Sequence, residues 1–123
     1  MRWNGNELTT LPRLADIEAG EWQEHARFPG ILMKGLLTSA DNPLASVNVV
    51  EVPPGGKIGR HRHAQQLETV WVIHGNAILT LDQTEVPMKD GQIIAIPVGL
   101  EHAVRNEGQA VLKLLTFFTP PLA

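Results

Sequence analysis

After Pro29-Gly30 the sequence alternates between short apolar runs and clusters of turn-forming residues, which limits the folds open to the chain. Runs such as ILMKGLL, ASVNVVEV, ETVWVIHG and QIIAIP favour strands, and turns such as PPGG, HGN, KDG and NEGQ separate them. The turn IHGNA reads as a tight hairpin, because Gly75 and Asn76 both tolerate positive φ. No amphipathic helical pattern lies between the runs, which argues against a parallel α/β sheet. The sequence therefore predicts an all-β domain, an antiparallel sandwich or barrel.

The first 26 residues are the most polar part of the chain and predict a separate N-terminal arm. Leu14 and Ile17 have loosely helical spacing, but Gly20 interrupts it. We therefore expect a short irregular arm over residues 1–26 and a single domain over residues 27–123. A chain of 123 residues is long enough to bury one hydrophobic core.

Composition narrows the partners and the chemistry that the chain can support. A formal net charge of −3 gives no electrostatic reason to expect nucleic acid or an anionic membrane as a partner. Cysteine is absent, which excludes thiolate metal ligands and cysteine nucleophiles and removes any need for an oxidising compartment. The N-terminus has no apolar run typical of a signal peptide, and no segment approaches the roughly 20 apolar residues of a spanning helix. We expect a cytoplasmic protein.

The stretch GRHRHAQQLETVWVIHG contains the first candidate ligands, His61, His63 and Glu68. In a strand, alternate side chains share a face, so the two histidines point the same way and suggest a shared ligand. Glu68 opens an apolar strand, where a buried carboxylate is costly without a partner such as a metal cation. The alternatives are a polar or packed strand face for the histidines and an exposed strand edge for the glutamate.

A fourth candidate ligand, His102, follows the turn PVG in a later strand, HAVRN. If that strand lies beside the strand of His61 in a rolled-up sheet, the four side chains can meet. Imidazole and carboxylate ligands suit Mn, Fe, Co, Ni, Cu or Zn. Four protein ligands and two waters would complete an octahedron, with open positions for chemistry.

Two complete motifs make the chain resemble a small single-domain cupin. The first is Gly, five residues, His-x-His, four residues, Glu, six residues, Gly, present here as Gly55, His61, His63, Glu68 and Gly75. The second is Gly, five residues, Pro-x-Gly, two residues, His, three residues, Asn, present as Gly91, Pro97, Gly99, His102 and Asn106. Together they span somewhat under half of the chain. The resemblance implies a jelly-roll β-barrel and one divalent transition metal per chain, bound by His61, His63, Glu68 and His102.

Several other polar residues are given weaker roles. His25 and His74 are assigned to a solvated arm and a turn, away from the site. Gln65 and Gln66 lie between the ligands and either reach a metal-bound water or belong to a solvated loop. Asn106 is expected to order backbone at a strand end.

Strand parity describes the expected pocket. Val70 and Val72 face inward with Glu68, whereas Arg60 and Arg62 lie opposite the ligands on the outer face. Inward charge beyond the ligands is hard to find, apart from Lys34 and Lys113, whose parity is uncertain. A phosphosugar site needs a cationic clamp, and none is evident. An apolar pocket around one metal suits a small, weakly charged organic molecule.

Three functional classes follow from this site. The first is a metal-dependent enzyme, either dioxygenase-like or an isomerase or lyase that uses the metal as a Lewis acid. The second is a non-catalytic module that binds or senses a metal or small ligand. The third, a storage or structural role, is remote for so short a chain. We favour the enzyme, with its catalytic acid or base unidentified.

The outward faces of several strands also predict a homodimer. ETVWVIHG is apolar on both faces, since Trp71 and Ile73 oppose Val70 and Val72. QIIAIP and VLKLLTFF likewise leave bulky residues facing outward. In a small monomer these side chains would form an exposed apolar patch, and a two-fold dimer is the commonest way to cover one. Alternatively, the N-terminal arm of the same chain covers them.

Overall fold

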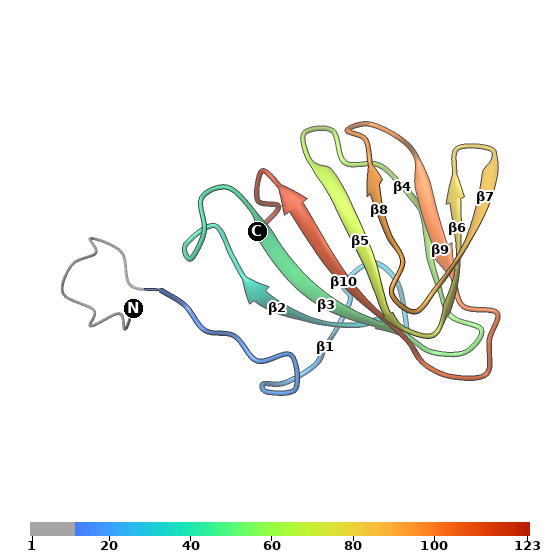
Figure 1. The fold of residues 1–123 in the computed structure, drawn as a ribbon, viewed down its shortest axis with the longest axis horizontal. Coiled ribbons are helices and arrows are strands. Elements are labelled where there is room, and N and C mark those ends of the chain that lie inside the picture. Colours follow the sequence, from blue (N-terminus) through green and yellow to red (C-terminus); the bar gives the residue numbers. More distant parts are fainter. Residues whose placement is uncertain (1–11) are drawn as a thin grey trace.

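The computed structural model describes residues 12–123, so the first eleven residues of the predicted arm lie outside it. Residues 12–123 form ten strands in two antiparallel sheets that pack face to face (Figure 1). The strands are β1 (Gln23–Glu24), β2 (Leu32–Leu37), β3 (Ser46–Val52), β4 (Lys57–His61), β5 (Leu67–His74), β6 (Asn76–Leu81), β7 (Thr84–Lys89), β8 (Ile93–Ile96), β9 (His102–Arg105) and β10 (Leu112–Thr119). Within residues 12–123 the structure has no apolar helix of membrane-spanning length.

The strand order is that of a jelly roll, as the sequence predicts. One sheet has the order β1-β2-β3-β10-β5-β8, and the other has the order β4-β9-β6-β7. Most neighbours are far apart in sequence, so the chain crosses repeatedly between the two sheets. The larger sheet curves away from the smaller one toward β2 and β3, as Figure 1 shows.

Alternating residues of the strands fill the space between the sheets. In β5, Val70 and Val72 are buried, whereas Trp71 on the other face is 42% exposed, which confirms the predicted parity. β10 alternates in the same way. The core consists of Ile31, Val50, Val52, Val70, Val72, Ala77, Leu79, Met88, Ile96, Val104, Leu112 and Leu114. Apolar burial of this kind, at roughly 25 cal/mol per Å², is the main stabilising term for the sandwich.

The turn IHGNA is not a hairpin, contrary to the sequence-based prediction. β5 ends at His74 and pairs with β8 and β10, whereas β6 begins at Asn76 and pairs with β7 and β9 in the other sheet. Gly75 has a φ of 108°, and a Cβ there would lie 3.0 Å from the Cα of Leu112. A glycine is therefore needed at this corner, where the chain leaves one sheet for the other. Local turn chemistry is the same for a hairpin and a corner, which explains the error.

Asn106, beyond the end of β9, binds three backbone groups. Its side-chain amide donates hydrogen bonds to the carbonyls of Val52 (3.0 Å) and Ala110 (2.9 Å), and its side-chain oxygen accepts one from the amide of Gly108 (2.9 Å). The side chain is buried, and it lies outside the cavity that contains the candidate ligands. Its predicted role in ordering backbone is confirmed.

The segment before β2 is joined to the larger sheet. Within the predicted arm, β1 pairs with β2 through Gln23 and Met33. Lys34 points away from the space between the sheets, since its ammonium donates to the carbonyl of Ala19 (3.0 Å) and lies 4.3 Å from the ring centroid of Trp22. Lys34 therefore holds the segment before β1 and brings no charge to the site.

Candidate metal centre

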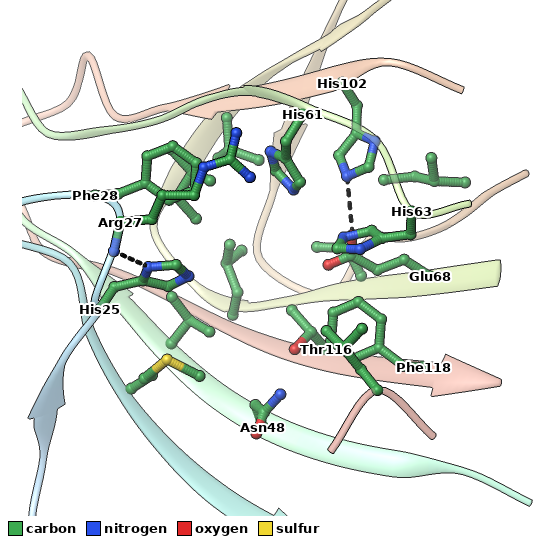
Figure 2. A pocket seen from close by; sticks show the side chains of 18 residues that line it. His25, Arg27, Phe28, Asn48, His61, His63, Glu68, His102, Thr116 and Phe118 are labelled. Carbon is green, nitrogen blue, oxygen red and sulfur yellow. Dashed lines mark hydrogen bonds and ion pairs between the residues drawn. The ribbon is translucent and has the colours of Figure 1, made fainter. Parts of the chain in front are cut away.

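The four predicted ligands come together from both sheets at one side of the cavity between them (Figure 2). His61 ends β4 and is the register partner of His102, which begins β9. His63 lies on the connection between β4 and β5, and Glu68 lies on β5 in the opposite sheet. The register between β4 and β9 provides two ligands, and the crossing to the other sheet provides the other two. The predicted meeting of these side chains is confirmed.

The potential ligand atoms are close enough to share one ion. One ligand atom from each of the four residues lies within 4.8 Å of all the others. The Nε2 atom of His102 is 2.9 Å from Oε1 of Glu68, and the Nε2 atom of His63 is 3.4 Å from the same oxygen. The rings of His61 and His102 have centroids 4.3 Å apart. Three imidazoles and one carboxylate form a ligand set suited to a divalent transition metal.

Backbone carbonyls orient two of the imidazoles. The Nδ1 atom of His61 lies 2.7 Å from the carbonyl oxygen of Gly59, and the Nδ1 atom of His102 lies 2.8 Å from that of Leu100. A carbonyl can only accept, so each Nδ1 atom carries the proton, and the lone pair of Nε2 is available to the centre in the neutral tautomer. This arrangement, in which the second ring nitrogen of a ligand is hydrogen-bonded, is typical of metal-binding histidines.

Glu68 is ionised although it is buried. Burial alone raises the pKa of Glu68, but hydrogen bonds with His102 and then His63, together with their charges, bring it down to about 2. Burial has the largest single effect on the pKa of His102 and lowers it, but the hydrogen bonds with Glu68 and with the carbonyl of Leu100, together with the charge of Glu68, leave the pKa raised. A metal cation bound between His102 and Glu68 would replace their direct 2.9 Å contact.

The cluster forms part of the wall of a cavity of about 240 Å³ between the sheets. Most of its lining is apolar and comes from Phe28, Met33, Val50, Ile58, Val70, Ile96, Val104, Leu114, Phe118 and Leu122. The remaining lining residues, besides the four ligands, are His25, Arg27, Asn48 and Thr116. The cavity is smaller than the roughly 300 Å³ at the lower end of sites for drug-sized ligands, so it suits a small molecule.

Two sequence-based assignments around the site are wrong. His25 lines the cavity, although we placed it on a solvated arm away from the site. Arg27 also lines the cavity, although the sequence shows no clear cationic side chain that faces the site. Both lie on the short connection between β1 and β2, where strand parity does not apply. No local signal in the sequence predicts that this connection reaches the cavity between the sheets.

The structure also shows where the other polar residues near the candidate ligands lie. Arg60 and Arg62 lie on the outer surface, where both form ion pairs with Glu101 at 3.1 and 3.2 Å. Gln65 is exposed, and Gln66 donates its side-chain amide to the carbonyl of Pro121 at 3.4 Å. Neither glutamine lines the cavity, so the solvated loop is the better of their two readings.

Comparison with known proteins identifies the family. A family model described as a cupin domain matches residues 48–118, which include all four candidate ligands. The chain belongs to the cupin family. An oxalate-binding protein of Thermotoga maritima is 27% identical over 66 residues, which are 54% of this cupin and 54% of the relative. The cupin therefore spans about half the length of this curated relative.

Solved structures support the fold assignment. A predicted oxalate decarboxylase from Thermotoga maritima superposes with a TM-score of 0.79 at 20% identity, covering 87% of this chain and 98% of the other. A sugar phosphate isomerase from a cupin superfamily, from Silicibacter pomeroyi, has a TM-score of 0.72 at 29% identity, covering 86% of this chain and 74% of the other. The jelly-roll fold of the cupin is thus shared by proteins named for different activities.

Proposed function

We propose that this cupin binds one divalent transition metal per chain through His61, His63, Glu68 and His102, and uses it to act on a small organic molecule. The observation that carries the proposal is the meeting of these side chains at one wall of an apolar cavity, with two imidazoles oriented by backbone carbonyls. Iron, manganese, nickel, zinc, cobalt and copper all suit this ligand set. The proposed reaction class is oxygenation of a small molecule, or a Lewis-acid isomerisation or lyase step.

The protein side chains would prepare the site for this chemistry. When bound, the metal would polarise a substrate oxygen, or it would hold the substrate next to dioxygen. The ring of Phe118 meets the ring of His63 edge to face, with centroids 5.0 Å apart, and so restricts the orientation of that imidazole. Val70, Ile96 and Val104 exclude water from the centre, which strengthens the electrostatic interactions of the substrate there.

A second candidate function is a non-catalytic binding module. Among residues 12–123, the only titratable side chains that line the cavity, apart from the ligands, are His25 and Arg27. Both come from the connection between β1 and β2, and no further acid or base on the strands that carry the ligands lines the cavity. One relative is named for binding oxalate, which supports this candidate. Binding without turnover would then be the function of the centre.

Elemental analysis followed by activity measurements tests the proposal. The protein is purified, its metal content is measured, and it is then loaded in turn with iron, manganese, nickel, cobalt, copper and zinc. We expect about one metal ion per chain, and oxygen consumption or product formation with a small organic acid, phenol or diketone for at least one metal. Binding without turnover across this set would favour the binding module. Failure to bind any of these metals would rule out the metal-dependent enzyme and leave only a module that binds a small ligand without metal.

Removal of the metal is expected to abolish function while leaving the fold intact. The core comes from strands of both sheets, so folding does not depend on the metal as it does in a zinc finger. Chelation should lower the melting temperature by about 10 °C or less, as for the loss of a ligand that binds the native state. Differential scanning calorimetry with and without a chelator measures this shift. Loss of the cooperative transition on chelation would contradict the prediction.

We further propose a two-fold homodimer through the outer face of β5 and β8. Trp71 on β5 and its register partner Ile93 on β8 are 42% and 60% exposed, which is costly for two large apolar side chains. Light scattering at micromolar concentration should give about twice the chain mass of 13.5 kDa. A mass near that of one chain would exclude the dimer. The cytoplasmic location stays a prediction from the sequence.

A further inference from the structure

Arg27 brings a cation to the cavity of the candidate metal centre. Its side chain lines the cavity and is exposed at the mouth, and Figure 2 shows the guanidinium directed from the β1–β2 connection toward His61. The ring of Phe28 is close to both groups, 5.4 Å from the Cζ atom of Arg27 and 5.6 Å from the ring centroid of His61. The cation and the metal ligands therefore face the same small space.

The connection that carries Arg27 is held in place at both ends. The amide of His25 donates to the carbonyl of Ile31 at 2.7 Å, and the amide of Gly30 donates to the side-chain carboxylate of Glu24 at 3.2 Å. Ile31 is fully buried in the core. The position of the Arg27 backbone is therefore set by the sheet, and only its side chain needs to adjust to a ligand.

The charge of Arg27 is not neutralised within the described part of the chain. Over residues 12–123, no carboxylate forms an ion pair with its guanidinium, whereas Arg60, Arg62 and Arg105 all have acidic partners. An arginine that lines a cavity without such a partner can form charge-assisted hydrogen bonds with a bound anion.

His25 supports an anion at the same place. Its Nδ1 atom accepts a hydrogen bond from the backbone amide of Arg27 at 3.0 Å, so in the neutral ring Nε2 carries the proton and can donate. Burial, followed by the charge of Arg27, lowers the pKa of His25, which keeps the ring neutral near pH 7. The β1–β2 connection thus offers one permanent positive charge and one neutral donor.

The positive charges around the cavity indicate the charge of the molecule that it would bind. A divalent metal with three neutral imidazoles and one carboxylate would leave one net positive charge at the centre, and Arg27 adds one more at the mouth. Arg27 is the only cationic lysine or arginine among the described residues that line the cavity. A single guanidinium matches one carboxylate, whereas a phosphate dianion is usually bound by more than one cation.

The geometry points to Arg27 as a substrate-binding residue that holds one carboxylate of a small organic diacid whose second carboxylate reaches the metal centre. This inference rests on the proposed function and narrows its substrate class from small organic molecules to organic acids charged at both ends. His25 donates a hydrogen bond to the same carboxylate. Arg27 acts in binding and orientation, and it takes no part in metal binding.

Calorimetric titration of the manganese-loaded protein tests the inference. The probes are succinate, glutarate and succinamate, in which one carboxylate of succinate is replaced by an amide, together with glycerol 3-phosphate. The variants are Arg27→Gln and Arg27→Lys, with Arg13→Gln as a control. Arg13 belongs to the same N-terminal region but lies outside this cavity, so the control removes one positive charge from elsewhere. Metal content is measured on each sample, and the melting temperature confirms that each variant is folded.

We expect Arg27→Gln to raise the Kd of succinate or glutarate at least about tenfold, with Arg27→Lys intermediate and Arg13→Gln unchanged. The preference of the wild type for succinate over succinamate should shrink in Arg27→Gln, while the metal content stays the same. Equal acid affinities in the wild type and Arg27→Gln, or no acid binding to the wild type, would overturn the inference. Tighter binding of glycerol 3-phosphate than of the acids, lost in Arg27→Gln, would overturn the choice of a carboxylate.

The outcome can be separated from that of the proposed function. A wild-type protein that retains no metal would refute the proposed metal centre. Acid binding that still depends on Arg27 in that metal-free protein would support the anion-binding role of Arg27. Conversely, full metal content together with an acid affinity that is unchanged in Arg27→Gln would support the metal centre and refute only the inference.

Discussion

The variants His61→Ala and His102→Ala are expected to purify with less than about a tenth of the wild-type metal content. Each change removes one of four ligands, which should cost more than the roughly 10–100-fold in affinity that follows loss of an outer hydrogen-bond partner. In His102→Ala the carboxylate of Glu68 also loses its 2.9 Å partner, and it becomes a buried charge without its main stabilising contact. Elemental analysis after exhaustive dialysis gives the metal content per chain.

A matched control separates ligation from the simple loss of an imidazole. His74 is exposed at the end of β5 and lies 3.4 Å from Asp90, outside the cavity. His74→Ala should therefore keep full metal content. Full metal content in both His61→Ala and His102→Ala would show that the metal is bound elsewhere. Loss of metal in His74→Ala as well would point to a general effect on the fold.

Asn106→Ala is expected to lower the free energy of unfolding by about 3 kcal/mol or more. The residue is 1% exposed, and its side chain makes three hydrogen bonds to backbone groups. Alanine would leave the carbonyls of Val52 and Ala110 and the amide of Gly108 without these partners, and each buried unpaired group costs about 1–3 kcal/mol. Urea denaturation, monitored by tryptophan fluorescence, measures the change.

The control for this prediction is Asn76→Ala. Asn76 is exposed at the start of β6, so its replacement should change the free energy of unfolding by no more than about 0.5 kcal/mol. The folded fraction of Asn106→Ala should still bind metal at the wild-type ratio, because Asn106 lies outside the cavity. A stability change below about 1 kcal/mol would show that water replaces the lost partners, against the expectation from burial.

The residues whose replacement should have the largest effects can therefore be identified from the sequence alone. His61 and His102 occupy motif positions, and strand parity places each of them on an inward face. Parity counted from Glu68 likewise predicts which side of β5 is buried, although that strand is apolar on both faces. These features are readable because they depend on period-two geometry within one strand, which needs no knowledge of the neighbouring strands.

The corner at Gly75 shows where this local reasoning ends. Positive φ at a glycine between two strands suits both a hairpin and a crossing between sheets. Which one forms depends on whether β6 finds its partners beside β5 or in the opposite sheet, and those partners, β7 and β9, lie later in the chain. The energy of strand pairing is therefore non-local, and the turn residues do not determine it.

The sequence by itself determined the class of fold, the inward faces of the strands and the ligand set of the candidate centre. Only the tertiary structure decided that His25 and Arg27 belong to the same cavity. These two residues lie on a connection with no periodic pattern, and their position depends on pairing between β1 and β2 and on burial of Ile31. Residues on such connections reach a site through contacts made by other segments, so their role is set by packing and not by local sequence.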